Sequence, residues 1–122
     1  MIKQFNNTFV LDTPNTTYLF TVLPSGHLEH LYYGKRIHVS CEEDILPLVE
    51  KRVCLAGNAV QYSPEYPTLG LEDVCLEMSS HGKGDIREPF IEVTHSDGSY
   101  TSDFLFDHAL IKVGKEKFET LP

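Results

Sequence analysis

The chain has 122 residues, of which 41% are hydrophobic, and it carries a formal net charge of −8. This length suits one domain with a core of its own, and the hydrophobic share excludes a disordered chain. Nucleic acids and anionic membranes attract clustered Lys and Arg, so the acidic balance argues against both as partners. The sequence contains neither an apolar stretch of the roughly 18 residues that a membrane span requires nor the apolar region of a signal peptide.

Strand patterns dominate the first forty residues. Segments rich in β-branched and aromatic side chains predict strands at 8–12, 16–23 and 27–33, with 36–39 as an extension of the sheet. Proline and glycine in Leu23-Pro24-Ser25-Gly26 favour a tight turn between the second and third strands. The expected arrangement is an antiparallel meander.

A single helical start signal follows. Ser40 and Glu43 have the spacing of a capping box, in which two side chains satisfy free backbone N–H groups reciprocally. Pro47 keeps any such helix short.

Residues 56–70 read as a long loop, because glycines, prolines and Asn58 interrupt the pattern throughout. Loops of this length are often functional in compact domains. Tyr62 and Tyr66 in this loop could stack on sugar rings or pack within the protein. For Tyr32 and Tyr33, in a strand, the simpler interpretation is one core-facing and one outward ring.

The strand pattern returns after Pro89. Asp97-Gly98 predicts a hairpin turn between strands at 90–95 and 99–106, and a last strand is expected at 109–113. The total is about eight strands, and the expected class is all-β with at most one short helix.

The acidic residues and histidines form no pattern that is typical of a catalytic or metal-binding site. The eighteen acidic residues show no spacing that would pair two carboxylates on a sugar, and they are typical of a solvated surface. His27 and His30 are three apart in a strand, which places them on opposite faces. We therefore predict no metal site and no cofactor.

Three cysteines, Cys41, Cys54 and Cys75, stand far apart. An odd number without a Cys-x-x-Cys pair argues against a disulfide framework. We read them as reduced thiols of a cytoplasmic protein, and no local signature supports a Cys-His nucleophile pair.

Residues 81–89 read HGKGDIREP and could suggest a phosphate-binding loop. A P-loop needs Lys followed by Ser or Thr and then a helix, whereas Lys83 is followed by Gly84 and, further on, by Pro89. The glycines are therefore expected to shape the entry to a strand through backbone with positive φ.

Four blocks in order carry a family resemblance: PSGHLEHLYYGKRI, LGLEDVCLEMSSHGKGDIREPFIEV, DGSYTSDFLF and GKEKFETLP. Together they resemble the N-terminal domain of glycoside hydrolase family 36, the bacterial α-galactosidases. The resemblance implies one domain over residues 1–122, an antiparallel β-sandwich of the supersandwich type. It also implies that the catalytic (β/α)₈ barrel, with its two catalytic aspartates, and a C-terminal β domain lie outside this chain, which then has no catalytic residue.

The resemblance further implies a tetramer in which residues 46–70 reach a neighbouring subunit's active site. It places an acidic substrate contact at Glu50, which joins the loop tyrosines Tyr62 and Tyr66 as a substrate-binding candidate. An arginine that some relatives contribute has no clear match here, because that region reads Tyr66-Pro67. The resemblance also marks five positions as structural or as part of an interface, namely Gly82, Gly84, Asp85, Arg87 and Pro89. Asp85 and Arg87 are expected to pair with each other or to meet the barrel.

The expected function is therefore a non-catalytic accessory and oligomerisation domain of a retaining α-galactosidase, which removes terminal α-galactosyl residues from substrates of the melibiose and raffinose type. The alternative is a free-standing carbohydrate-binding module, suggested by the acidic loop with its tyrosines.

Overall fold

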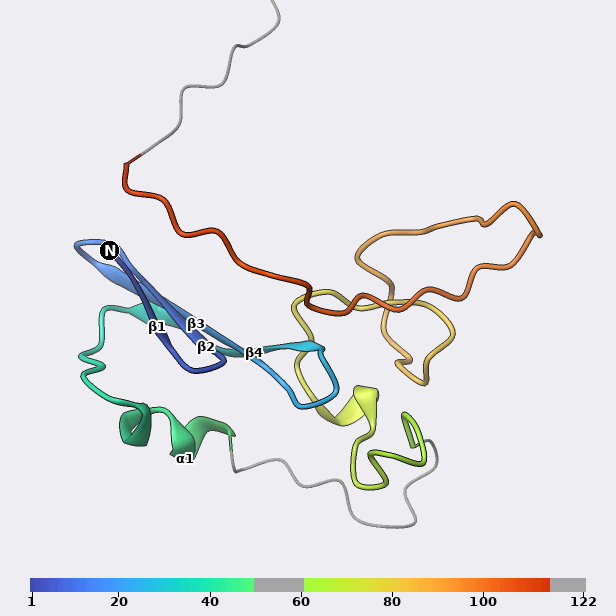
Figure 1. The fold of residues 1–122 in the computed structure, drawn as a ribbon, viewed down its shortest axis with the longest axis horizontal. Coiled ribbons are helices and arrows are strands. Elements are labelled where there is room, and N and C mark those ends of the chain that lie inside the picture. The colour runs from blue at the N-terminus through green and yellow to red at the C-terminus, as the bar shows by residue number, and fades with distance from the viewer. Residues whose placement is uncertain (50–60, 115–122) are drawn as a thin grey trace, which may run out of the picture.

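The computed structural model describes residues 1–49 and 61–114. Its centre is a four-stranded antiparallel sheet in which neighbours in sequence are neighbours in space (Figure 1). The strands are β1 (Ile2–Phe5), β2 (Thr8–Asp12), β3 (Thr16–Val22) and β4 (Leu28–Lys35). The meander predicted from sequence is thus confirmed, with β1 as an additional edge strand.

Turn chemistry explains the strand order. Between β1 and β2, Phe5 pairs with Thr8 across a two-residue turn, and Asn6 adopts a positive φ of 50°, which asparagine tolerates well. Between β3 and β4, the amide of Gly26 donates to the carbonyl of Leu23, and Gly26 itself has φ of 89°. Both turns are short enough to fix the register of the strands that they join.

One face of the sheet carries the hydrophobic core. Val10 and Leu19 from neighbouring strands pack with Val39 and Ile45, and all four are buried. The covering chain contains the 3₁₀ turn η1 (Glu42–Asp44) and the short helix α1 (Leu46–Val49).

The helix start differs from the prediction in one detail. The cap residue of η1 is Cys41, and the acid that accepts the hydrogen bonds is Asp44, not Glu43. The Asp44 carboxylate accepts from the amide of Ser40 at 2.9 Å and from its hydroxyl at 3.0 Å. The capping box therefore lies one residue later than predicted, with Cys41 and Asp44 in the places expected for Ser40 and Glu43.

The outer edge of β4 is partly covered by residues 75–77, which follow the 3₁₀ turn η2 (Leu71–Asp73). His30 donates its amide hydrogen to the Cys75 carbonyl, and Glu77 donates to the Leu28 carbonyl. These two bonds continue the antiparallel pattern for a short distance beyond the fourth strand.

Beyond this point the chain departs from the predicted strands. Residues 36–39, 90–95, 99–106 and 109–113 form no ladder in the described part, so the structure has four strands where about eight were expected. The Asp97-Gly98 turn does form, since the His95 amide donates to the Ser99 carbonyl at 2.9 Å, but its flanks do not pair. Residues in this region meet no second strand within the described chain.

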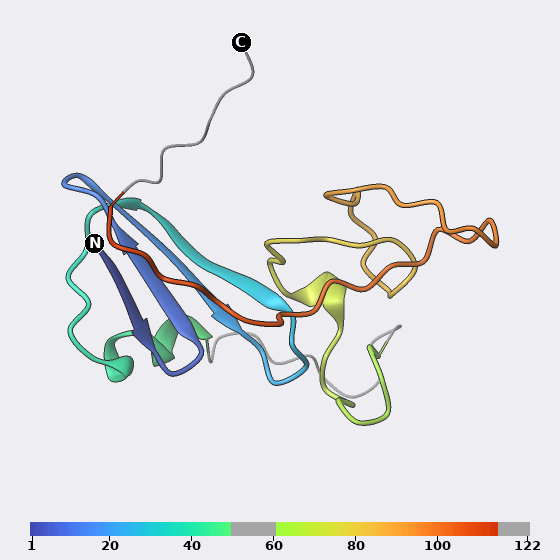
Figure 2. The same ribbon diagram turned by 45° about the horizontal axis from the view of Figure 1, so that its top comes forward.

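Two views show how these segments lie. Residues 76–102 form a lobe beside the sheet, and the chain then returns along the sheet face opposite to α1 (Figures 1 and 2). Within residues 1–49 and 61–114, the fold class predicted from sequence is confirmed as all-β and antiparallel, with one short helix.

Candidate functional site

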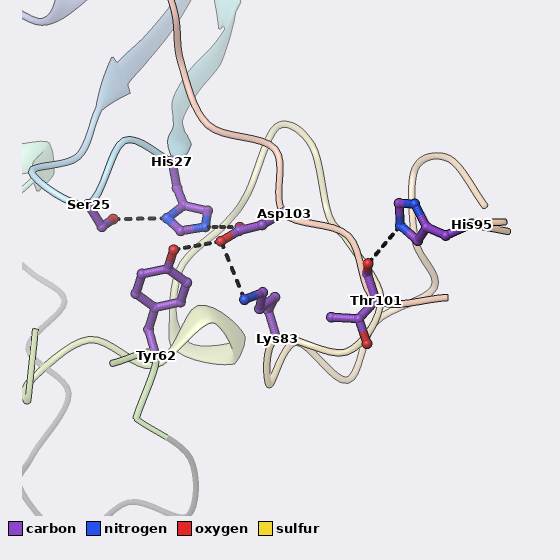
Figure 3. Close-up of polar contacts among 7 residues, drawn as sticks. All are labelled: Ser25, His27, Tyr62, Lys83, His95, Thr101 and Asp103. Atoms are coloured by element: carbon purple, nitrogen blue, oxygen red, sulfur yellow. Dashed lines mark hydrogen bonds and ion pairs between the residues drawn. The ribbon is translucent and has the colours of Figure 1, made fainter. Parts of the chain in front are cut away.

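A polar cluster sits where the β3–β4 turn meets the returning chain (Figure 3). His27 is 2% exposed, and its two ring nitrogens are both engaged: Nδ1 lies 2.9 Å from Ser25 Oγ, and Nε2 lies 2.8 Å from Asp103 Oδ1. A buried imidazole needs such partners, because an unsatisfied ring nitrogen would lose its hydrogen bond to water.

The second carboxylate oxygen of Asp103 has partners of its own. Tyr62 donates its hydroxyl to Asp103 Oδ2 at 2.6 Å, and Lys83 Nζ lies 3.9 Å from the same oxygen. The hydrogen bond to Asp103, together with burial, raises the pKa of Tyr62 to about 12. The Tyr62 and His27 rings also form a T-shaped pair, with centroids 4.6 Å apart.

Serine, histidine and aspartate in hydrogen-bond contact are the residue types of a nucleophilic relay. Here Ser25 and His27 are two residues apart in one tight turn, and Tyr62 occupies the other oxygen of the aspartate. We therefore interpret the cluster as a structural clamp. It joins four segments that are distant in sequence: the β3–β4 turn, the 61–70 loop, the Gly82–Gly84 turn and the chain at Asp103.

Sequence reasoning missed Asp103. It lies in DGSYTSDFLF, one of the blocks that carry the family resemblance, but nothing in that block marks one acid among eighteen as the partner of a buried histidine. The available hint was His27 itself, because a histidine next to a tight turn at the start of a strand needs a partner if it is buried.

Tyr66 lies beside the clamp, with its ring 6.4 Å from that of Tyr62, and it lines a pocket of about 290 Å³. Its hydroxyl donates to the Pro24 carbonyl at 2.9 Å. Glu29 and Glu65 line the same pocket, and Glu29 is 2% exposed. Of the two loop tyrosines named as substrate-binding candidates, Tyr66 therefore borders a pocket, whereas the hydroxyl of Tyr62 is bound by Asp103 and its ring packs on His27.

The glycines of residues 81–89 adopt the positive φ that was expected from sequence. Gly82 and Gly84 both have φ of 89°. A Cβ atom on Gly82 would lie 2.4 Å from the hydroxyl oxygen of Thr101, so this position also excludes a side chain by close approach. The turn carries Lys83 toward Asp103 rather than forming an anion cradle.

Asp85 and Arg87 form a two-point ion pair. Arg87 Nε lies 2.8 Å from Asp85 Oδ1, and Nη2 lies 3.1 Å from Oδ2. Nη2 also donates to the Leu71 carbonyl at 2.8 Å, which ties this segment to η2. The Asp85 side chain is fully covered, while Arg87 is 39% exposed, and Pro89 is half-buried nearby in sequence.

The remaining predicted positions add little to the candidate site. Glu50 and Cys54 lie outside the described residues. Cys41 and Cys75 are free thiols of intermediate exposure. Tyr32 packs against the core cluster and Tyr33 is 69% exposed, which confirms the predicted division between the two rings.

Two broader findings concern the described part of the chain. Across residues 1–49 and 61–114, no group of three or more His, Cys, Asp or Glu side chains could hold a metal ion. Within the same residues, no helix has both the length and the apolar character that crossing a bilayer requires.

Known proteins resemble this chain in both sequence and fold. The chain is 32% identical over 114 residues to the bifunctional alpha-galactosidase/sucrose kinase AgaSK of Mediterraneibacter gnavus, covering 93% of this chain and 12% of that protein. It is 28% identical over 121 residues to alpha-galactosidase 1 of Pediococcus pentosaceus, covering 99% of this chain and 16% of the relative. The chain thus spans less than a fifth of the length of either relative.

Solved structures agree. The galactosidase domain of AgaSK superposes with a TM-score of 0.76 and 28% identity, over 98% of this chain and 16% of that one. The alpha-galactosidase of Lactobacillus brevis superposes with a TM-score of 0.71 and 30% identity, over 87% and 14% of the two chains. The sequence model of the glycosyl hydrolase family 36 N-terminal domain matches residues 26–122, so this chain belongs to that family.

Proposed function

We propose that this chain is a non-catalytic accessory domain of a retaining α-galactosidase, an enzyme that hydrolyses terminal α-galactosyl residues of melibiose-type and raffinose-type substrates. The observation that carries the proposal is the match of residues 26–122 to the N-terminal domain of family 36. The relatives named above are alpha-galactosidases, and this chain corresponds to a small share of each. The clamp around Asp103 supports a scaffolding role, because its polar groups bind one another.

The partners in this proposal are the catalytic barrel of the same enzyme and, through oligomerisation to a tetramer, a neighbouring subunit. Residues 46–70 would border the neighbour's active site, with Glu50 and Tyr66 contacting the substrate beyond its terminal galactose. The pocket beside Tyr66 supports a sugar contact, since an aromatic ring and carboxylates are groups that sugars commonly meet. A cytoplasmic location belongs to the same proposal and is supported by free thiols at Cys41 and Cys75.

The first test is an activity assay of the purified chain with 4-nitrophenyl α-galactoside. The expected result is no turnover above a buffer control. A glycosidase requires two facing carboxylates, and Glu29 and Glu65 both line the pocket beside Tyr66, so their substitution distinguishes turnover by this chain from turnover by a contaminant. Turnover that disappears in Glu29→Gln or Glu65→Gln would therefore overturn the proposal.

The second candidate function is a free-standing carbohydrate-binding module, which the pocket beside Tyr66 favours. Calorimetric titration of the chain with galactose, melibiose and raffinose separates the two. An accessory domain should give no measurable heat of binding. Binding that Tyr66→Ala abolishes and Tyr100→Ala leaves unchanged would support the module instead, because Tyr100 is exposed outside this pocket.

The contact proposed for Glu50 can be tested in a chimera in which this chain replaces the matching segment of the AgaSK galactosidase domain. Remote binding energy helps to position the reacting centre, so Glu50→Ala should lower kcat/KM for raffinose about tenfold to a hundredfold and affect an aryl galactoside less. Equal effects on both substrates would remove Glu50 from the site.

A further inference from the structure

The loop of residues 62–69, which we call the tyrosine loop, is closed by its own backbone. The Tyr62 amide donates to the Leu69 carbonyl at 2.8 Å. Inside this closure, the Leu69 amide donates to the Tyr66 carbonyl at 3.0 Å, and the Tyr66 amide donates to the Ser63 carbonyl at 3.1 Å. The tyrosine loop therefore has a shape of its own, and contacts with other segments set its position.

Two tyrosine hydroxyls connect the tyrosine loop to the β3–β4 turn. The Tyr66 hydroxyl donates to the carbonyl of Pro24 in that turn at 2.9 Å. The Tyr62 hydroxyl donates to Asp103 at 2.6 Å, and the other oxygen of this carboxylate binds His27 at the end of the same turn (Figure 3). One tyrosine thus reaches the turn directly, and the other reaches it through Asp103.

The pocket beside Tyr66 lies between these two elements. Its lining includes residues 23–25 from the turn and residues 65–69 from the tyrosine loop. Because both tyrosine hydroxyls bridge the loop and the turn, they set the separation of two walls of the pocket. A displacement of about 1 Å is enough to lose a productive contact with a bound substrate.

The side chain of Ser63 shows that the tyrosine loop is held in place at a cost. Its hydroxyl oxygen is buried and has no hydrogen-bond partner within residues 1–49 and 61–114. A buried hydroxyl without a partner costs free energy, because it has given up water without a replacement. The loop keeps this position in spite of Ser63, which indicates that the contacts of its two tyrosines hold it there.

We propose that Tyr62 and Asp103 are positioning residues, which hold Tyr66 where a substrate group beyond the terminal galactose can meet it. They act through Tyr66 and do not touch the substrate. The inference rests on the proposed function, in which Tyr66 contacts the substrate of a neighbouring subunit. It adds that the preference for longer galactosides depends on a carboxylate outside the tyrosine loop.

The first test is Tyr62→Phe in the AgaSK chimera described for Glu50. This variant removes the hydroxyl and keeps the ring that packs on His27. The kcat/KM for raffinose should fall about fivefold, and that for an aryl galactoside should fall less. Tyr32→Phe is the matched control, because it removes a hydroxyl that donates to the carbonyl of Lys35, at the other end of β4 from the turn. It should change neither value by more than about twofold.

A second pair of variants separates positioning from a general loss of structure. Tyr66→Ala removes the ring that Tyr62 is proposed to position. In that background, Tyr62→Phe should change the kcat/KM for raffinose by less than about twofold, because nothing is left to misplace. A merely structural role would give the same fall in both backgrounds, and that result would overturn the inference.

Asp103 can be tested by a conservative rescue. Asp103→Asn keeps a carbonyl oxygen for the Tyr62 hydroxyl, and its amide can donate to the other tautomer of His27. It should therefore keep the kcat/KM for raffinose within about twofold. Asp103→Ala offers neither group and should lower this value at least about fivefold. Equal losses in the two variants would count against positioning by hydrogen bonds.

Amide exchange of the 122-residue chain supplies a measurement without turnover. Tyr62→Phe should speed exchange of the Leu69 amide about tenfold, because a loosened loop opens its internal bonds more often. Tyr32→Phe should leave this exchange unchanged. An equal rate in Tyr62→Phe and the wild type would overturn the inference.

The comparison with Tyr66→Ala also separates the two proposals. If Tyr66→Ala lowers the kcat/KM for raffinose selectively and Tyr62→Phe does not, the substrate contact stands and this inference alone fails. If Tyr66→Ala affects raffinose and the aryl galactoside equally, the proposed contact fails and this inference fails with it.

Discussion

His27 Nε2 lies 2.8 Å from Asp103 Oδ1, although 76 residues separate the two in sequence. The contact joins the β3–β4 turn to the point from which the chain returns over the sheet (Figure 3). Because Asp103 also accepts the hydroxyl of Tyr62, a single carboxylate holds together the two ends of the segment between residues 62 and 103. The position of Phe106 over the sheet therefore depends on this carboxylate.

Asp103→Ala should destabilise the chain by about 2 to 4 kcal/mol, because it leaves His27 and Tyr62 without their acceptor in a largely buried place. Asp107→Ala, at a 91% exposed carboxylate four residues away, is the control and should change the free energy of unfolding by less than about 0.5 kcal/mol. Urea denaturation measures both. Equal effects of the two substitutions would show that Asp103 is not a clamp.

The two glycines at positions 82 and 98 separate backbone strain from steric exclusion. Both have positive φ, 89° and 83°, but a Cβ on Gly98 would meet nothing within 4 Å. Gly98→Ala should cost about 1 kcal/mol from its backbone conformation alone. Gly82→Ala should cost about 2 to 4 kcal/mol, since it adds a clash with Thr101.

Thermal or urea unfolding of both glycine variants supplies the comparison. Gly82→Ala combined with Thr101→Ala should recover part of the loss, because two of the three closest atoms are then removed. Identical costs at the two positions would mean that Thr101 moves aside freely.

The sequence predicted the first sheet well and the later strands poorly, for a physical reason. The strands predicted at 8–12, 16–23 and 27–33 pair across short turns whose residues are visible in the sequence, such as Gly26 between the last two. Residues 99–106 and 109–113 have the same strand-like composition, but a ladder also needs a partner, and no described segment supplies one. Local preference alone does not form a strand.

The candidate site was likewise predictable from the sequence only in part. The positive φ of Gly82 and Gly84 was predictable, because two glycines around a lysine mark a turn that other residues would strain. The contact of Tyr62 with Asp103 was not, since it spans 41 residues and follows from the path of the whole lobe. Long-range side-chain contacts of this kind leave no pattern in a single sequence.

The ion pair between Asp85 and Arg87 should be energetically coupled. Two parallel hydrogen bonds to a carboxylate that is fully covered favour a coupling free energy of about 1 to 2 kcal/mol, above the range of ordinary surface pairs. The measurement is a double-mutant cycle of Asp85→Ala and Arg87→Ala in urea unfolding. Arg87→Lys should recover little, because lysine lacks the planar fork. A coupling below about 0.3 kcal/mol would reduce the pair to a solvated contact.

The pKa of Tyr62, raised to about 12 by its hydrogen bond to Asp103 and by burial, predicts a loss of stability in alkali. The unfolded tyrosine titrates near 10, so the folded state favours the neutral phenol. The resulting stabilisation is fully present below about pH 10 and falls away between about pH 10 and 12, where the unfolded chain ionises first. Since the ring is only partly buried, solvent screening reduces this contribution to about 1 kcal/mol.

Tyr62→Phe should therefore lose less stability than the wild type between pH 10 and 12, while the two respond alike at lower pH. The ultraviolet absorbance of tyrosinate gives the direct measurement: the difference between wild type and Tyr62→Phe should show one phenol ionising near pH 12. Asp103→Asn is the decisive control, because it removes the charge and leaves a hydrogen-bond acceptor, and it should bring that ionisation down toward the ordinary value near pH 10. An ionisation that stays near 12 in Asp103→Asn would assign the shift to burial and not to the carboxylate.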